Sequence, residues 1–295
     1  MSLLAKRYTT LLRPEVLLEH KKPLLLATSL LAAAAPLLAY LRSQYLEWLA
    51  LGRGGVPHNI LGFLAQSLLS PFARRDTRRP LPSSVPVLEA FAALYGPVGA
   101  DSFLASWVHG RERAGARPAV PRFVAPQRQT SDAADAATLA RMTAFLQTLA
   151  QRNAALFERR ISGLEGPPHA ALYLRAARGR ALTAPVRARE GELNVRLGRG
   201  AKGEWAHVHG EGSAHVTLSP ADAAVLIEAG WAERHRLSGV GGKRAMVPYG
   251  YVLVYAPRDD AEFEIWREVL LAGARYVAVG AGVAVVAPEE DCASA

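Results

Sequence analysis

The longest hydrophobic stretch of the chain lies near its start. Residues 23–41 contain no charged side chain and are bounded by Lys22 and Arg42. The run has about the length of a membrane-spanning helix, roughly 17–25 residues, although Pro36 would kink such a helix. A cleaved signal peptide or a buried core helix would give a similar run. We expect a single-pass membrane anchor within residues 1–42, with the side of the membrane left open.

Helical and strand-like patterns follow in the rest of the chain. Apolar residues three and four positions apart predict one helix that is capped by Ser131 or Asp132, and a last helix that is capped by the segment Asp259 to Glu262 and runs to about Val277. Shorter segments, such as Tyr249 to Tyr255, have the composition and alternation of strands. Strands and helices that segregate in this way are typical of an α+β domain with two layers, antiparallel strands and packed helices.

This pattern divides the chain into four parts. We expect the anchor in residues 1–42 and a helical and extended region in 43–160 that packs on the core. The α+β domain then occupies residues 161–278, and a tail covers 279–295.

Histidines are concentrated in one part of the expected domain. His207 and His209 are two positions apart, so a strand would place both imidazoles on one face. The residues from Gly210 to Ser213 favour a hairpin turn, which would bring His215 close to one of them across the ladder. Ser219 and Pro220 then predict the start of a short helix that ends at Gly230.

Two kinds of chemistry suit these histidines. Three imidazoles from neighbouring strands could bind a metal, with Glu211 as a fourth ligand. Alternatively, a histidine could take a proton from a weakly acidic hydroxyl near neutral pH. Arg234, His235 and Arg258 would then hold the resulting anion, because guanidinium groups match oxyanions.

The order of unusual residues here carries a family resemblance. After the histidines come Gly230-Trp231, Glu233-Arg234-His235 and Tyr255-Ala256-Pro257-Arg258. Together with Gln127-Arg128-Gln129 further upstream, this order resembles the fungal (mushroom) luciferases and the wider family of luciferase-domain proteins, over roughly residues 1–278. The turn from Gly210 to Ala214 departs from the luminous pattern, which is bulkier and more polar.

The resemblance implies a specific reaction. A luciferase of this kind oxidises 3-hydroxyhispidin, a hydroxy-α-pyrone, with O₂ and without a separate cofactor, through an endoperoxide that loses CO₂ and can emit light. His207 or His209 would be the base, and aromatic side chains would enclose the flat substrate. The expected catalytic residues are His207, His209, His215, Arg234, His235 and Arg258. The expected substrate-binding residues are Trp205, Glu211, Trp231, Tyr255, Gln127 and Arg128.

Other classes of protein receive little support from the composition. The net charge is +9, but the arginines are dispersed, so we expect no nucleic-acid partner and a membrane instead. The single cysteine, Cys292, excludes an internal disulfide, and no glycine motif for a dinucleotide follows a strand. Two alternatives to the cofactor-free enzyme stay open: a membrane-tethered protein that binds a small molecule without turnover, and a metallo-oxygenase with histidine ligands.

Overall fold

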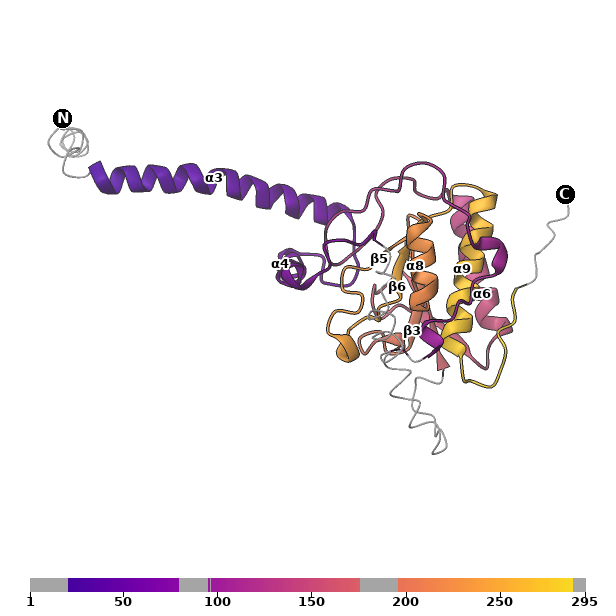
Figure 1. Cartoon of the computed structure of the whole chain (residues 1–295). Helices are drawn as coiled ribbons and strands as arrows, with labels where there is room; N and C mark the ends of the chain where they lie inside the picture. The colour runs from indigo at the N-terminus through magenta and orange to yellow at the C-terminus, as the bar shows by residue number, and fades with distance from the viewer. Residues whose placement is uncertain (1–20, 80–94, 96, 176–195, 289–295) are drawn as a thin grey trace. The chain divides into compact units, whose positions relative to one another are not determined.

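The computed structural model describes residues 21–79, 95, 97–175 and 196–288 (Figure 1). The chain falls into two units, Met1–Ala50 and Leu51–Ala295, which are described separately. The described part of the first unit is one helix of 30 residues, α3 (Lys21–Ala50), which contains the uncharged run and Pro36.

The expected membrane-spanning helix is not supported by the structure. Within the described ranges, no helix combines the length and the apolar character that crossing a bilayer requires. The membrane localisation therefore stays a prediction.

The second unit is built on a sheet of six antiparallel strands in the order β1-β2-β3-β4-β6-β5. The strands are β1 (Phe157–Ile161), β2 (Ala170–Leu174), β3 (Glu204–Val208), β4 (Ala214–Thr217), β5 (Ala232–Arg234) and β6 (Tyr251–Val254). The predicted α+β class with antiparallel strands and packed helices is confirmed. Since β1 begins at Phe157, the sheet crosses the expected boundary between residues 160 and 161.

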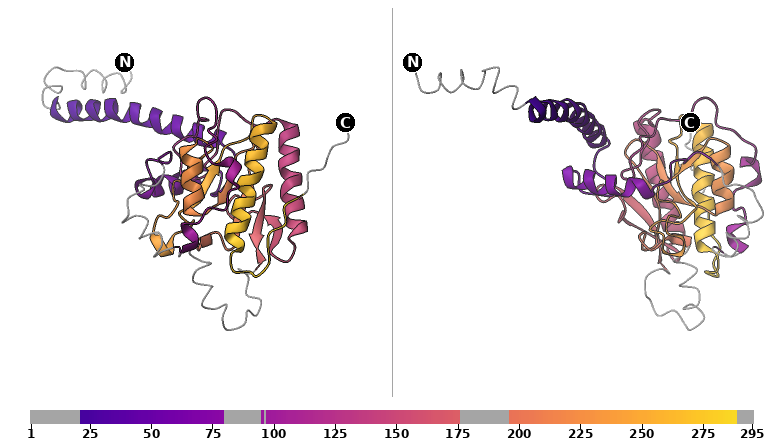
Figure 2. Two further views of the ribbon diagram at one scale, coloured as in Figure 1. Left: turned by 45° about the vertical axis from the view of Figure 1, so that its right-hand side comes forward. Right: turned by 60° about the vertical axis from the view of Figure 1, so that its left-hand side comes forward.

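Three helices stand side by side over one face of this sheet (Figures 1 and 2). They are α6 (Ala136–Arg152), α8 (Pro220–Glu228) and α9 (Asp260–Ala278). The shorter elements are α4 (Ile60–Leu69), η1 (Ser70–Phe72), η2 (Pro97–Gly99), η3 (Ser106–Val108) and η5 (Gly242–Arg244).

The helix starts follow from capping side chains. Ser219 caps α8 by accepting from the Asp222 amide, and Asp259 caps α9 by accepting from the Glu262 amide, as the sequence predicts. The predicted start of α6 at Ser131 or Asp132 is wrong, because Asp135 caps this helix. The Gln129 side-chain amide donates to the carbonyl oxygens of Ser131 and Asp132, which keeps both residues in the preceding loop.

The core lies between the sheet and the three helices. Leu172, Val216 and Val252 from the strands are fully buried against residues such as Leu226 and Val269 from the helices. Burial of these apolar side chains is the main stabilising term of such a unit.

The opposite face of the sheet has an irregular cover. Three segments, 51–56, 122–130 and 162–169, contact one another there through Arg128, whose guanidinium donates to the carbonyl oxygens of Leu51 and Arg53 and to Glu165. The histidines of β3 and of the turn that follows it lie beneath these covering segments.

Candidate functional site

The hairpin of β3 and β4 brings three histidines together as predicted. His207 lies directly opposite His215 in the ladder. The turn between them is closed by a hydrogen bond from the His209 amide to the Ser213 carbonyl, and Gly212 supplies a positive φ of 94°. The ring of His209 lies 5.0 Å from both His207 and His215. All three side chains are buried.

A register shift next to the hairpin changes which residues share the face of His207. Leu172 pairs with Ala206 and Tyr173 pairs with Glu204, so Trp205 has no residue opposite it in β2. An extra residue of this kind interrupts the alternation of a strand. Glu204 therefore lies beside His207, with Oε1 2.7 Å from Nδ1.

The contacts of the Trp205 side chain show on which face of the sheet it lies. Its ring packs on Phe157, and a Cβ added at Gly273 of α9 would meet it at 3.3 Å. Trp205 thus belongs to the core between sheet and helices. It lies on the face away from His207, and not beside the histidines, where the family resemblance implies a substrate wall.

The Nδ1 atom of each of the three histidines has a hydrogen-bond acceptor. His207 donates to the Glu204 carboxylate at 2.7 Å, and His215 donates to the carbonyl of Val252 at 3.2 Å. His209 lies 2.8 Å from Ser213 Oγ, which gives its own proton to Glu211 and so can only accept. With the proton on Nδ1, each neutral imidazole presents the lone pair of Nε2.

The Nε2 atoms of His207 and His209 turn toward a fourth residue, Glu165. Its Oε1 lies 3.7 Å from His209 Nε2 and 4.0 Å from His207 Nε2, both longer than a hydrogen bond. Neither Nε2 has a hydrogen-bond partner, although both are buried. One donor atom from each of Glu165, His207, His209 and His215 falls within 4.8 Å of the others. We call these four residues the histidine–glutamate cluster.

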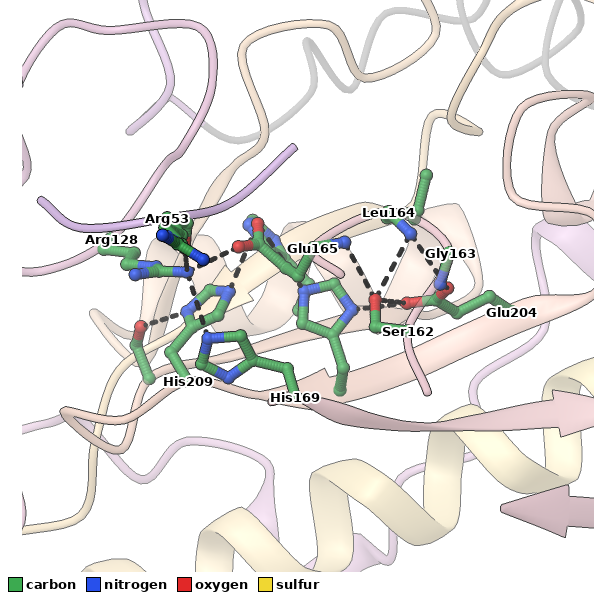
Figure 3. A network of polar contacts seen from close by, with 12 residues as sticks. Arg53, Arg128, Ser162, Gly163, Leu164, Glu165, His169, Glu204 and His209 are labelled. Carbon is green, nitrogen blue, oxygen red and sulfur yellow. Dashed lines mark hydrogen bonds and ion pairs between the residues drawn. The ribbon is translucent and has the colours of Figure 1, made fainter. Parts of the chain in front are cut away.

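Glu165 is held by the loop between β1 and β2 and by Arg128 (Figure 3). The guanidinium donates to Oε2 at 2.6 Å, and the Glu165 amide donates to Ser162 Oγ at 2.9 Å. A Cβ at Gly54 would lie 2.0 Å from Oε2, so the glycine allows the covering chain to approach this close. Oε1 is left facing the histidines.

Burial and mutual contact shift the pKa values of the cluster in opposite directions. Burial alone would raise the pKa of Glu165, but His209, His207 and Arg128 bring it well below its usual range. Burial, together with His209 and His235, lowers the pKa of His215 well below its ordinary value. The pKa of His209 is raised, because Glu165 and Glu211 outweigh the effect of its burial.

Further aromatic residues surround the cluster. Tyr251 of β6 stacks on His215, with ring centroids 4.8 Å apart and an interplanar angle of 14°. His235 lies 5.2 Å from His215, and burial lowers its pKa to about 4. His169, which is partly exposed, lies 6.0 Å from His209 and joins the cluster to the loop surface.

Of the expected site residues with charged or amide side chains, only some lie at the cluster. Arg128 contacts it through Glu165, as described. Gln127 donates instead to Glu233 and to the carbonyl of Arg234. The guanidinium of Arg234 lies over the ring of Tyr249, 4.3 Å from its centroid.

Arg258, Trp231 and Tyr255 make contacts of other kinds. Arg258 pairs with Glu262 at the start of α9. Trp231 donates from Nε1 to the carbonyl of Arg111, and the Tyr255 hydroxyl donates to Glu233. None of these described contacts reaches the three histidines. Glu211 touches His209 from its Nδ1 side, at 3.4 Å, and not from the Nε2 side where Glu165 lies.

The structure adds residues that the sequence pattern does not indicate. Glu165 lies in the segment 162–168, which reads as a polar linker between two regions, so nothing in its surroundings marks a buried carboxylate. The contact of Glu204 with His207 could not be predicted, because it depends on the register shift between β2 and β3. Tyr251 could have been found, because it shares a strand face with Leu253 and Tyr255 by simple alternation.

Comparison with known families gives one match. The model of the Luciferase domain family matches residues 202–273, from just before β3 into α9. The three histidines of the cluster lie inside this segment, whereas Arg128 and Glu165 precede it. No curated protein and no solved structure matches the chain. The match indicates a luciferase-like function, and it makes residues 202–273 similar to the Luciferase domain family.

Proposed function

We propose that this protein is an O₂-dependent enzyme that oxidises a small, electron-rich hydroxy-α-pyrone of the 3-hydroxyhispidin type at the histidine–glutamate cluster. The similarity of residues 202–273 to the Luciferase domain family supports the general class. The arrangement of the cluster supports the location that we propose for the reaction.

The observation that carries this proposal is the pair of unpartnered nitrogens. Nε2 of His207 and Nε2 of His209 are buried, face the Glu165 carboxylate and have no hydrogen bond. A buried polar atom without a partner costs about 1–3 kcal/mol. Such groups are retained where they serve a ligand or a reaction.

The reaction requires that the protein bind the substrate with its hydroxyl group deprotonated. The enolate then gives electrons directly to O₂, both oxygen atoms add across the ring, and loss of one CO₂ leaves the oxidised product. The atoms and electrons balance without an external reductant. The chain contributes the site for the enolate and a buried environment that keeps water away from reactive intermediates.

The substrate has to approach from the irregular side of the sheet. The other face is closed by the tightly packed α9, since a Cβ at Gly273 would meet Val216 at 2.8 Å. Around the cluster, Tyr251 and His235 add aromatic rings that pack on His215 and on each other. Stacking on such rings suits a planar pyrone.

The test is O₂ consumption by the purified protein, as isolated, with 3-hydroxyhispidin as the probe. We expect one O₂ consumed and one CO₂ released per molecule of substrate. Light is recorded separately, since the turn from Gly210 to Ala214 departs from the luminous pattern. His209→Ala should lower the rate by about 10²–10⁴.

His109→Ala provides the matched control, because His109 is an exposed histidine. It should keep the rate of the unmodified protein, and both variants should keep a cooperative melting transition. Stoichiometric binding of the pyrone without O₂ consumption would refute the enzyme and leave the binding protein. A rate that survives His209→Ala would place the reaction elsewhere.

A further inference from the structure

We propose that His207, His209, His215 and Glu165 together bind one divalent transition-metal ion. The proposal deepens the function above and rests on it for the role of the ion, which is to hold the deprotonated hydroxyl of the substrate. It replaces the cofactor-free expectation, and it changes the predicted carboxylate ligand from Glu211 to Glu165.

The first support is the orientation of the imidazoles. Each Nδ1 is occupied by an acceptor: the Glu204 carboxylate for His207, Ser213 Oγ for His209 and the Val252 carbonyl for His215. Histidines that bind metals typically donate their other ring N–H to a carboxylate or a carbonyl, which fixes the tautomer and the ring. The arrangement therefore leaves Nε2 of each ring as the available ligand atom.

The second support is the distance between the ligand atoms. Bonds of about 2.1 Å place tetrahedral ligands about 3.4 Å apart. The separations from Glu165 Oε1 to Nε2 of His209 and His207 are 3.7 and 4.0 Å, and all four ligand atoms lie within 4.8 Å of one another. Small side-chain movements are enough to close this shell. Without an ion the same distances are too long for hydrogen bonds, which leaves the nitrogens unpartnered.

The third support is charge. The cluster contains one carboxylate, Glu165, and is contacted by two more, Glu204 and Glu211, and by one guanidinium, Arg128. Among the described side chains in direct contact, these carboxylates and the guanidinium alone carry an excess of two negative charges. Uncompensated charge is costly in a protein interior. A divalent cation balances it.

The carboxylate is also prepared for a single bond to an ion. Arg128 occupies Oε2 of Glu165 at 2.6 Å, and this leaves Oε1 free toward the histidines. The surrounding loop is fixed by Ser162, whose Oγ accepts from the Glu165 amide and donates to Glu204. The same loop thus holds a ligand and a hydrogen-bond partner of His207, as second-sphere contacts do in metal sites.

The ligand types select the class of ion. Imidazole nitrogens suit Zn²⁺, Fe²⁺, Co²⁺ and Ni²⁺, whereas Mg²⁺ and Ca²⁺ prefer oxygen ligands throughout. Three nitrogens and one carboxylate oxygen therefore indicate a first-row transition metal. An ion that accepts more than four ligands keeps room for the hydroxyl oxygen of a substrate.

The test uses the full chain without an affinity tag of histidines. The protein is treated with chelator, dialysed, and titrated with Co²⁺, Ni²⁺ or Zn²⁺, with Mg²⁺ as the control ion. Calorimetry and metal analysis should give one ion per chain for the transition metals and a rise in melting temperature, and Mg²⁺ should give neither. Bound Co²⁺ should show a visible spectrum that changes when the pyrone is added.

Variants separate this site from adventitious binding. Glu165→Gln and His209→Gln, which keep the side chains near their original size, should weaken binding by at least about 100-fold, and Glu204→Gln should weaken it by about 10–100-fold. Glu233→Gln is the matched control, because this buried carboxylate bonds Tyr255 and Gln127 and not the cluster. It should leave the affinity unchanged.

The outcomes distinguish the ion from the proposed reaction. Failure of the three transition metals to bind, or binding that Glu165→Gln leaves intact, would overturn the metal site. If O₂ consumption then continues in chelated protein, the reaction stands without a metal. One tightly bound ion with no turnover would keep the site and refute the reaction. A Co²⁺ spectrum that the pyrone leaves unchanged would overturn the role of the ion in holding the substrate.

Discussion

The buried pair of Arg128 and Glu165 gives a quantitative prediction for stability. The two side chains are 9% and 6% exposed, and the guanidinium donates hydrogen bonds to Glu165, to the carbonyl oxygens of Leu51 and Arg53 and to Nε2 of His169. Arg128→Met removes these donors and leaves a buried carboxylate unpaired. Breaking such a pair typically costs about 3–5 kcal/mol, and we expect a loss in this range.

Glu165→Gln should cost less, because the amide oxygen still accepts from Arg128. We expect about 1–3 kcal/mol for it, the cost of weakening a charged hydrogen bond. In the double variant neither charge is left unpaired, so the loss should fall short of the sum of the single losses by about 2 kcal/mol.

Urea unfolding in the presence of chelator measures all four proteins of this cycle. The chelator ensures that a bound ion does not contribute to the free energy of unfolding. Additivity within about 0.5 kcal/mol would show that the two residues are independent. That result would refute the reasoning, because it would mean that Arg128 does not neutralise Glu165.

Three other predictions follow from single contacts. Trp205→Ala should reduce stability by about 3–5 kcal/mol in urea unfolding, since the side chain fills the core; a selective loss of pyrone affinity at unchanged stability would contradict this. Gly54→Ala should lower metal affinity, measured by calorimetry, because the new Cβ would lie 2.0 Å from Glu165 Oε2; Gly210→Ala, where a Cβ would meet nothing within 4 Å, is the control for added volume. The full chain should sediment with membranes after an alkaline carbonate wash, whereas a chain that starts at Ser43 should not; a full chain that washes off would contradict the anchor.

The hairpin with its histidines was within reach of the sequence, because the relevant contacts are local. The turn from Gly210 to Ser213 and the strand period of two are enough to place His215 opposite His207. The same holds for the caps at Ser219 and Asp259, where a side chain binds an amide three residues away.

The fourth member of the cluster depended on the tertiary structure. Glu165 is 42 positions before His207 and comes from a loop that lies under a separate covering segment, so no spacing rule connects the two. The face of Trp205 depended on the tertiary structure for a related reason. Alternation assumes a regular ladder, and the register shift against β2 becomes visible only when the two strands are paired.

The sequence by itself therefore determined the α+β class, the hairpin and the resemblance to luciferase-domain proteins, since each follows from short-range pattern. Only the tertiary structure decided which side chains share the buried site. It shows that Glu165, and not Glu211, groups with the three histidines, and that Trp205 lies in the core. It also shows that Arg258 forms an ion pair with Glu262. The physical reason is that hydrogen bonds and charge compensation in an interior are satisfied between residues distant in sequence, and chain folding alone brings them together.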